Sequence, residues 1–372
     1  MNESSEYPYW MALSHLPNWG NEKINRLIIE IIQGKKISFS EFFALNEKEM
    51  KIEFNLSSNQ LIDINEVRSE LPNYSFLAEN FLAQDFQLIP LNSKDYSETL
   101  KQNLKTKDAP PLLYVKGNIK LLNEDSIAIV GSRSAADISL AFTKNIAKKC
   151  AERYEVVVSG FAKGVDKMAL DATLEYNGHS IIVLPQGILT FGSGIKKYYK
   201  KIIDGDVLIL STYHPKAPWS IGLAMNRNIY IYGLAKTIYV AESDSKGGTW
   251  NGVIDGLKKG RKIFIRKPEK DEKNANNMLI MQGAIPVDPY GQPVEADKDD
   301  LEGKLKRILS KGQLSIASIS EKLDIEIDQD NLKKLLANLP FVDSKLVKKR
   351  KYYFLKNSIP HQPELFSDQT DD

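Results

Sequence analysis

The sequence contains little cysteine and little histidine. Cys150 is the only cysteine among 372 residues, and the four histidines are scattered without the H-E-x-x-H spacing of a zinc hydrolase. One thiol cannot form an internal disulfide or a thiolate cluster for zinc or iron–sulfur. We therefore expect a reducing compartment and no bound metal.

A dominant charge and a long hydrophobic run are also missing. The 50 lysines and arginines nearly offset 48 aspartates and glutamates, for a net charge of +2, so any basic surface for nucleic acid must be local. No stretch approaches the roughly 18 apolar residues that a membrane span requires. The N-terminal residues lack the basic start and apolar core of a signal peptide. We expect a soluble, cytoplasmic protein without membrane contact.

From residue 126 the sequence alternates short apolar segments with longer amphipathic ones. The strands that we expect are 126-SIAIVG-131, 155-EVVVSG-160, 180-SIIVLP-185, 206-DVLIL-210, 237-TIYVAE-242 and 262-KIFIR-266. Their β-branched, apolar composition is typical of strands covered by helices on both faces. Helices over 140–154, 167–177, 221–235 and 250–260 would connect them. The pattern predicts an α/β fold with a doubly wound, mostly parallel sheet.

Different patterns flank this region, which we assign to a domain over 85–289. Apolar residues at helical spacing predict a small helical, SAM-like domain over 1–84. The polar segment 290–300 is typical of a linker. Three helical patterns and a hairpin over 301–357 predict a winged-helix domain, and the polar tail 358–372 is typical of disorder.

The ends of the expected strands are polar and rich in glycine. In an open parallel sheet these carboxyl ends form the ligand site. Small residues let a ligand approach the main chain, whose N–H groups at a helix start attract anions, and arginine and lysine suit phosphate oxygens. The pattern therefore favours a phosphate-bearing ligand, although each glycine alone could simply make a tight turn. The candidate residues are Gly131, Ser132, Arg133, Ser159, Gly160, Lys163, Gly164, Gly187, Gly247, Gly248 and Thr249.

Two common phosphate ligands lack their sequence signatures. The loop 131-GSRSAAD-137 keeps only the first glycine of G-x-G-x-x-G, which argues against a dinucleotide, and no G-x-x-x-x-G-K-[ST] sequence is present. We expect no cofactor. Two tyrosines lie between pairs of lysines in 196-KKYYKK-201, where charge could follow phosphates while rings stack on bases of a single strand. A solvated helix with its tyrosines packed inward explains this segment equally well.

Six short motifs in one order resemble the DNA-processing protein A family (DprA/Smf). They are 108-DAPPLLYVKGN-118, 129-IVGSR-133, 158-VSGFAKGVD-166, 183-VLPQG-187, 227-RN-228 followed by 233-GLA-235, and 276-NNMLIMQGA-284. The resemblance covers residues 85 to 288. It implies a Rossmann-like domain that binds single-stranded DNA, dimerises and helps load the RecA recombinase during DNA uptake, recombination or repair, without catalysis.

By position in these motifs, the resemblance implies a phosphate contact for the loop Gly131–Arg133. It also implies DNA contacts at Lys196 and Lys197, which match a basic position of the family, and at Arg227 and Asn228, which match the start of its arginine–asparagine–arginine motif. The chain departs from the family in having Ile229 where the motif has a second arginine. It is thus similar to a divergent member.

The alternative is a Rossmann-like nucleotide sensor or a nucleotide phosphoribohydrolase. Its feature is the turn 247-GGT-249, which resembles the PGGxGTxxE motif of those enzymes. The acidic residue of that motif is absent, because the chain continues with Trp250, Asn251 and Gly252 and its next carboxylate is Asp255.

Overall fold

The central sheet of the computed structural model is built from the short apolar segments identified above. The structure describes residues 3–269, 272–295, 301–323, 329–347 and 350–356. Over these residues the sheet runs in the order β1-β2-β6-β5-β4-β3-β7-β8-β9. The strands from β6 to β9 along this order are parallel, whereas β2 is antiparallel to β1 and β6. The strand bounds are β1 Gln87–Pro90, β2 Leu112–Gly117, β3 Ser126–Val130, β4 Val156–Ser159, β5 Ser180–Val183, β6 Val207–Ser211, β7 Thr237–Val240, β8 Ile263–Arg266 and β9 Ile285–Val287.

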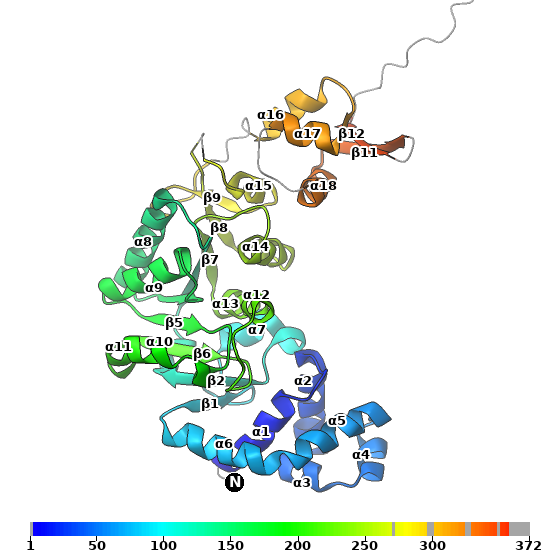
Figure 1. Cartoon of the computed structure of the whole chain (residues 1–372), viewed down its shortest axis with the longest axis vertical. Helices are drawn as coiled ribbons and strands as arrows, with labels where there is room; N and C mark the ends of the chain where they lie inside the picture. Colours follow the sequence, from blue (N-terminus) through cyan, green and yellow to red (C-terminus); the bar gives the residue numbers. More distant parts are fainter. Residues whose placement is uncertain (1–2, 270–271, 296–300, 324–328, 348–349, 357–372) are drawn as a thin grey trace, which may run out of the picture.

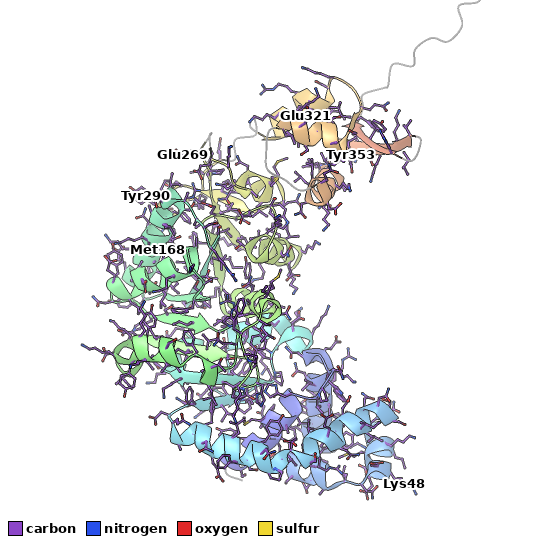
Figure 2. The ribbon with its side chains drawn as sticks, in the orientation of Figure 1. Lys48, Met168, Glu269, Tyr290, Glu321 and Tyr353 are labelled. Carbon is purple, nitrogen blue, oxygen red and sulfur yellow. The ribbon has the colours of Figure 1, made fainter. Side chains whose placement is uncertain are left out.

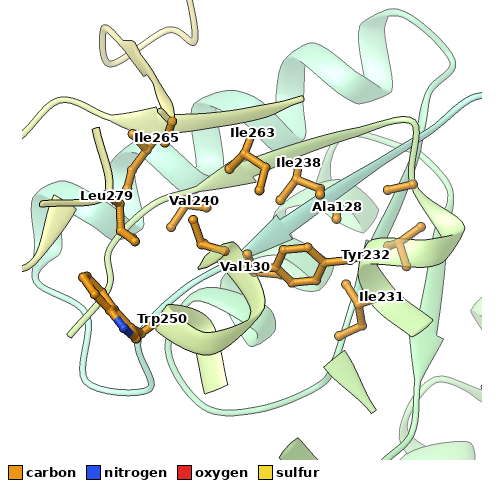
Figure 3. Packing of buried hydrophobic residues seen from close by; sticks show 14 of the residues in the cluster. Ala128, Val130, Ile231, Tyr232, Ile238, Val240, Trp250, Ile263, Ile265 and Leu279 are labelled. Carbon is orange, nitrogen blue, oxygen red and sulfur yellow. The ribbon is translucent and has the colours of Figure 1, made fainter. Parts of the chain in front are cut away.

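Alternate strand residues bury their side chains on opposite faces of the sheet, which is why the strands are apolar throughout. On one face, Val130 and Val240 join a cluster with side chains of α13 and α14, among them Tyr232 and Trp250 (Figure 3). On the other face, Ile129 and its neighbours pack beneath α8 and α9. The sheet helices are α7 Glu98–Asp108, α8 Asp137–Glu152, α9 Val165–Glu175, α10 Gly192–Lys197, α11 Tyr199–Ile203, α12 Ile221–Asn226, α13 Asn228–Leu234, α14 Gly248–Lys258 and α15 Asn276–Met281.

One expected helix is divided. The spacing predicts a continuous helix over 221–235, but the chain forms α12 and α13, with Arg227 between them as the N-cap residue of α13. The interruption accompanies the burial of the Arg227 side chain, which donates from Nη1 to the Val183 carbonyl at 2.7 Å. The other connecting helices lie within about three residues of the expected bounds.

The N-terminal helices pack directly on one end of the sheet. Side chains of α1 and α6 share an apolar cluster with β2 and β6 residues, including Tyr114 and Ile209. His15, at the end of α1, forms a 2.7 Å hydrogen bond between its Nε2 and the Tyr114 hydroxyl. Capping boxes at Ser38, Asn46 and Ser57 begin three of these helices. The bounds are α1 Tyr7–Ser14, α2 Asn21–Ile29, α3 Phe39–Ala44, α4 Glu47–Glu53, α5 Ser58–Ser69 and α6 Leu71–Ala83, with a π-helical turn at Glu30–Lys35.

The C-terminal unit consists of helices followed by a hairpin, in the order expected from the sequence. Its elements are α16 Leu301–Leu309, β10 Leu314–Ser315, α17 Ile316–Leu323, α18 Gln329–Asn338, β11 Val342–Val347 and β12 Arg350–Leu355, and the strands pair in the order β10-β12-β11. Figure 2 places Lys48 of the N-terminal helices near one end of the long axis and Glu321 and Tyr353 of this unit near the other. The chain curves between them, with α12, α13 and α14 along its concave side (Figure 1).

Part of the expected linker packs against the sheet. The Val294 N–H donates to the Pro286 carbonyl at 3.0 Å, and Val287 forms a β-bridge with Pro293. Residues 296–300 and the tail 358–372, for which disorder is expected, lie outside the described residues. Among the helices that the structure describes, none is both long enough and apolar enough to cross a membrane.

Candidate functional site

A cleft lies where the order of the strands along the chain reverses. The chain passes from β3 to β4 on one side and, after β6, returns to β7 on the other side of β3. The loops that follow β3 and β7 therefore diverge, which leaves a crevice at the carboxyl ends of the two strands. Its volume is about 320 Å³. The lining comes from the end of β3 and the loop after it (Val130–Ser134), from Ala162 and Asp166 after β4, and from α12, Arg227 and α13. The loop after β7 and the start of α14 complete it with Asp244 and Lys246–Thr249.

The loop after β3 is held by a hydrogen bond within the loop and by one to the segment that follows β7. The Ser132 N–H donates to the Glu242 carbonyl at 2.9 Å, and the Ser132 hydroxyl accepts from the Ser134 N–H at 3.2 Å. Ser132 is consequently buried, whereas Arg133 is exposed at the cleft. Arg133 makes no hydrogen bond or ion pair with any residue that the structure describes. Its donors are free for a ligand.

Gly164 permits the close approach of the loops after β3 and β4. It adopts φ +77°, and a Cβ there would lie 2.4 Å from the Ser132 carbonyl oxygen. A side chain would therefore meet both backbone strain and a collision with main-chain atoms. Gly160 meets a different neighbour, because its Cβ would lie 1.7 Å from Nη1 of Arg227. Both glycines shape the cleft wall without lining the cavity.

Arg227 and Asp166 form a buried, loosely paired floor. Arg227 is 3% exposed, its Nη2 lies 3.8 Å from Asp166 Oδ2, and its Nε has no hydrogen-bond partner among the described residues. Burial raises the pKa of Asp166, an effect that the Arg227 charge opposes. Burial likewise lowers the pKa of Arg227. The floor thus carries a cation whose hydrogen-bonding capacity is only partly used.

The N-terminus of α14 closes the opposite side of the cleft. Gly247 precedes the helix at φ +95°, and Gly248 and Thr249 form its first turn beside the exposed Lys246. Unpaired N–H groups and the helix dipole make such an end attractive to an anion. The Asn228 amide lies against Gly248, where a Cβ would come within 2.7 Å of its Nδ2. Asn331 of α18 donates to the Ser245 carbonyl, so the C-terminal unit contacts this loop.

Other predicted residues lie outside the cleft lining. Ser159 is buried and donates from Oγ to the Ile129 carbonyl at 2.8 Å. Lys163 is exposed on the loop after β4. The Gly187 N–H donates to the Ala217 carbonyl at 2.9 Å, so Gly187 braces the segment before α12. Lys196 and Lys197 are exposed on α10.

The segment 196-KKYYKK-201 has features of both interpretations, the solvated helix and the surface for a single strand. Tyr198 packs inward and donates to Asp171 Oδ1 at 2.9 Å, as expected of a solvated amphipathic helix. Tyr199 is 58% exposed. Phe161, next to the cleft residue Ala162, contacts the Tyr198 ring with centroids 5.8 Å apart. The basic segment therefore adjoins the loop after β4 without entering the cleft.

Several lining residues were not predicted as site residues from the sequence. Ile221, Met225 and Tyr232 line the cleft from α12 and α13. Together with Asn228 they recur at intervals of four, three and four residues, the spacing of one helical face. That spacing could have identified them. The Tyr232 hydroxyl is buried without a hydrogen-bond partner among the described residues. Ile229, at the divergent motif position, packs against the apolar cluster.

The fold and the cleft define a doubly wound α/β protein with an anion-attracting site at the topological switch point. The sequence profile of the family described as DNA recombination-mediator protein A matches residues 87–296. This match covers more than half of the chain, which therefore belongs to the DNA recombination-mediator protein A family, that of DprA and Smf.

Individual relatives agree with this assignment. The DNA processing protein DprA of Streptococcus pneumoniae is 34% identical over 158 residues, which is 42% of this chain and 55% of that protein. Protein Smf of Escherichia coli is 31% identical over 209 residues, which is 54% of each protein. These matches span about half the length of each relative. The crystal structure of the Streptococcus pneumoniae DprA superimposes with a TM-score of 0.55 at 25% identity, covering 75% of this chain and 93% of that one.

Proposed function

We propose that this chain is a non-catalytic protein that binds single-stranded DNA through the cleft at the switch point. The observation that carries the proposal is the convergence on one cavity of the unpaired Arg133, the exposed Lys246 and the N-terminus of α14. All three attract phosphate oxygens. A cavity of about 320 Å³ can hold one nucleotide unit. Membership of a family of DNA recombination mediators supports DNA as the source of that unit.

The remaining predicted residues would extend this contact. Lys196 and Lys197 on α10 adjoin the loop after β4 through Phe161, and Lys163 is exposed on that loop. A strand that leaves the cleft in this direction would pass these lysines. Such a path would neutralise several phosphates without requiring a large net charge on the whole chain.

Membership of a family of recombination mediators supports a role in DNA recombination. In the role that we propose, the bound strand would be handed to a recombinase of the RecA type during uptake, recombination or repair of DNA, and the chain would act as a homodimer. The order of helices and hairpin in the C-terminal unit supports a winged helix there. The contact of α18 with the Ser245 carbonyl supports a position of this unit beside the cleft.

A nucleotide phosphoribohydrolase is the second candidate, because of the turn at Gly247–Thr249. Its general acid or base would have to come from a carboxylate near this turn. Asp255, the first one after the turn, is outside the cleft lining and pairs with Lys259 at 3.0 Å. Asp166 and Asp244 line the cleft, and Asp166 faces Arg227.

The proposal is tested by replacing Arg133 with alanine. We expect affinity for an unstructured oligodeoxynucleotide to fall about 10- to 100-fold, because a charge-assisted contact is lost. The slope of log affinity against log salt should shrink by ~0.7 for each phosphate contact removed. Fluorescence anisotropy at several salt concentrations measures both quantities.

Lys48→Ala is the matched control, because this exposed lysine lies among the N-terminal helices far from the cleft (Figure 2). The control should bind like the unaltered protein. Equal affinity of Arg133→Ala and Lys48→Ala would contradict the site. Release of free base from nucleoside monophosphates, without oligonucleotide binding, would favour the hydrolase instead.

A further inference from the structure

An exposed apolar surface borders the cleft on the α12 side. Trp219 is 50% exposed, Ile221 is 68% exposed and Met225 is 44% exposed. Ile221 and Met225 also line the cleft, so the surface is continuous with the cavity. By contrast, Trp10, Trp19 and Trp250 are each at least 91% buried. The fold buries its other tryptophans and leaves Trp219 open to solvent.

The segment that carries Trp219 is braced at several points. The Gly187 N–H donates to the Ala217 carbonyl at 2.9 Å, and the Tyr213 hydroxyl donates to the Leu223 carbonyl at 2.9 Å. Ser220, next to Trp219, caps α12 by accepting from the Leu223 N–H at 3.1 Å. The indole therefore stands on a fixed backbone, which limits the ordering entropy that a contact would cost.

The charges near this surface indicate what it contacts. Arg133 and Lys246 line the adjacent cavity, and Lys216 is exposed three residues before Trp219. The acidic side chains in the lining are Asp166, which faces Arg227, and Asp244. Phosphate-binding donors beside an apolar ring are the two elements that single-stranded nucleic acid requires. A protein partner would not require a phosphate-type cavity at the edge of the patch.

We infer that Trp219 is a stacking platform for a base of the strand whose phosphate occupies the cleft. The inference rests on the proposed function and adds the residue that contacts the base. Ile221 and Met225 would extend the apolar floor between the indole and the cavity. Because every base has a flat face, this contact would strengthen binding with little sequence preference.

The experiment compares two oligomers of equal length, oligothymidylate and an abasic deoxyribose-phosphate chain, on the full-length protein. We expect Trp219→Ala to weaken oligothymidylate binding about tenfold, the effect of losing one stacked base, and to leave abasic binding unchanged. Trp219→Phe keeps a flat ring and should retain most of the affinity. Phe76→Ala, which removes an exposed aromatic ring from α6, is the matched control and should change neither.

Tryptophan fluorescence supplies an independent readout. Oligothymidylate should quench the emission of the unaltered protein, and Trp219→Ala should lose that quenching. Equal binding of oligothymidylate by Trp219→Ala and the unaltered protein would overturn the inference while leaving the proposed function intact. Loss of self-association in Trp219→Ala by light scattering, with unchanged oligothymidylate binding, would also overturn it and assign the surface to a second copy. Failure of the unaltered protein to bind either oligomer would overturn the inference and the proposed function together.

Discussion

Two buried arginines lie at the carboxyl edge of the sheet in different surroundings. Arg266, at the end of β8, is 2% exposed and binds Glu272 through two hydrogen bonds of 2.7 and 2.5 Å. It also donates to the Ala241 carbonyl at 3.1 Å and to the Ser139 hydroxyl at 2.9 Å. Among the described residues, the Arg227 guanidinium has one hydrogen-bond acceptor, the Val183 carbonyl, and a carboxylate 3.8 Å away. The donors of the Arg266 guanidinium are used within the fold, whereas the Arg227 guanidinium retains hydrogen-bonding capacity at the cleft.

The difference separates a cation whose donors are used within the fold from one that keeps an unpaired donor beside the cleft. The Arg266 network continues through Ser139, whose hydroxyl donates to Glu242 Oε2 at 2.6 Å. Glu242 Oε2 also accepts from the Ala136 N–H at 3.1 Å, and so supplies the cap that the start of α8 lacks. This network holds the loop after β3 in place. Burial of a charge without complete pairing is costly, and such a charge at a cavity indicates a ligand site.

Removing the partner of Arg266 should have the largest effect on stability. We expect Glu272→Ala to lower the free energy of unfolding by about 3–5 kcal/mol, because it leaves a buried guanidinium without its carboxylate. Chemical denaturation followed by circular dichroism measures the change. Glu269→Ala, an exposed neighbour, is the control and should stay within about 0.5 kcal/mol. A similar small loss for Glu272→Ala would remove the distinction between the two arginines.

Replacing Arg227 should lower stability less than Glu272→Ala does, and it should weaken oligonucleotide binding more. We expect Arg227→Met to lower the free energy of unfolding by about 1–3 kcal/mol, because one hydrogen bond is lost and Asp166 can take up a proton. The same change should weaken oligonucleotide binding by the protein that remains folded. Denaturation and anisotropy on the same preparation separate these effects. Unchanged oligonucleotide affinity would place Arg227 with Arg266 as a purely structural residue.

The pH dependence of stability should have opposite signs for the two carboxylates, Glu272 and Asp166. Burial alone would raise the pKa of Glu272, but hydrogen bonds from Arg266 and the Glu269 N–H outweigh it and the pKa is lowered. Its stabilising contribution is present at neutral pH and is lost as the pH falls below about 4. Burial raises the pKa of Asp166. Its ionisation therefore opposes folding, and stability is lost as the pH rises above about 4.

Denaturation between pH 3 and 7 tests this contrast. The stability advantage of the unaltered protein over Glu272→Gln should shrink as the pH falls. Its stability relative to Asp166→Asn should instead increase as the pH falls. If both stability differences changed with pH in the same direction, the contrast between the carboxylates paired with the two arginines would be contradicted.

Local sequence patterns were sufficient for much of the fold. The apolar strands from 126 to 266 and their connecting helices follow from periodicity, and each of the six expected strands is present. The break at Arg227 did not follow from local spacing, and the buried Arg227 side chain there forms a hydrogen bond with Val183, 44 residues away. Strand-end chemistry identified the loop at Gly131–Arg133 and the turn at Gly247–Thr249, which the structure brings to one cavity. The same strand-end pattern did not reveal that Lys196 on α10 lies outside the cleft lining.

The amino-acid sequence by itself determined the strands, the glycine-rich turns and the absence of a dinucleotide fingerprint, since these depend on residues close together in the chain. It also carried the six ordered motifs of the family. Only the tertiary structure decided which cations remain unpaired and which aromatic side chains stay exposed. Arg227 and Arg266, or Trp219 and Trp250, are the same residue types in sequence. They differ because burial and pairing depend on partners supplied by distant strands and loops.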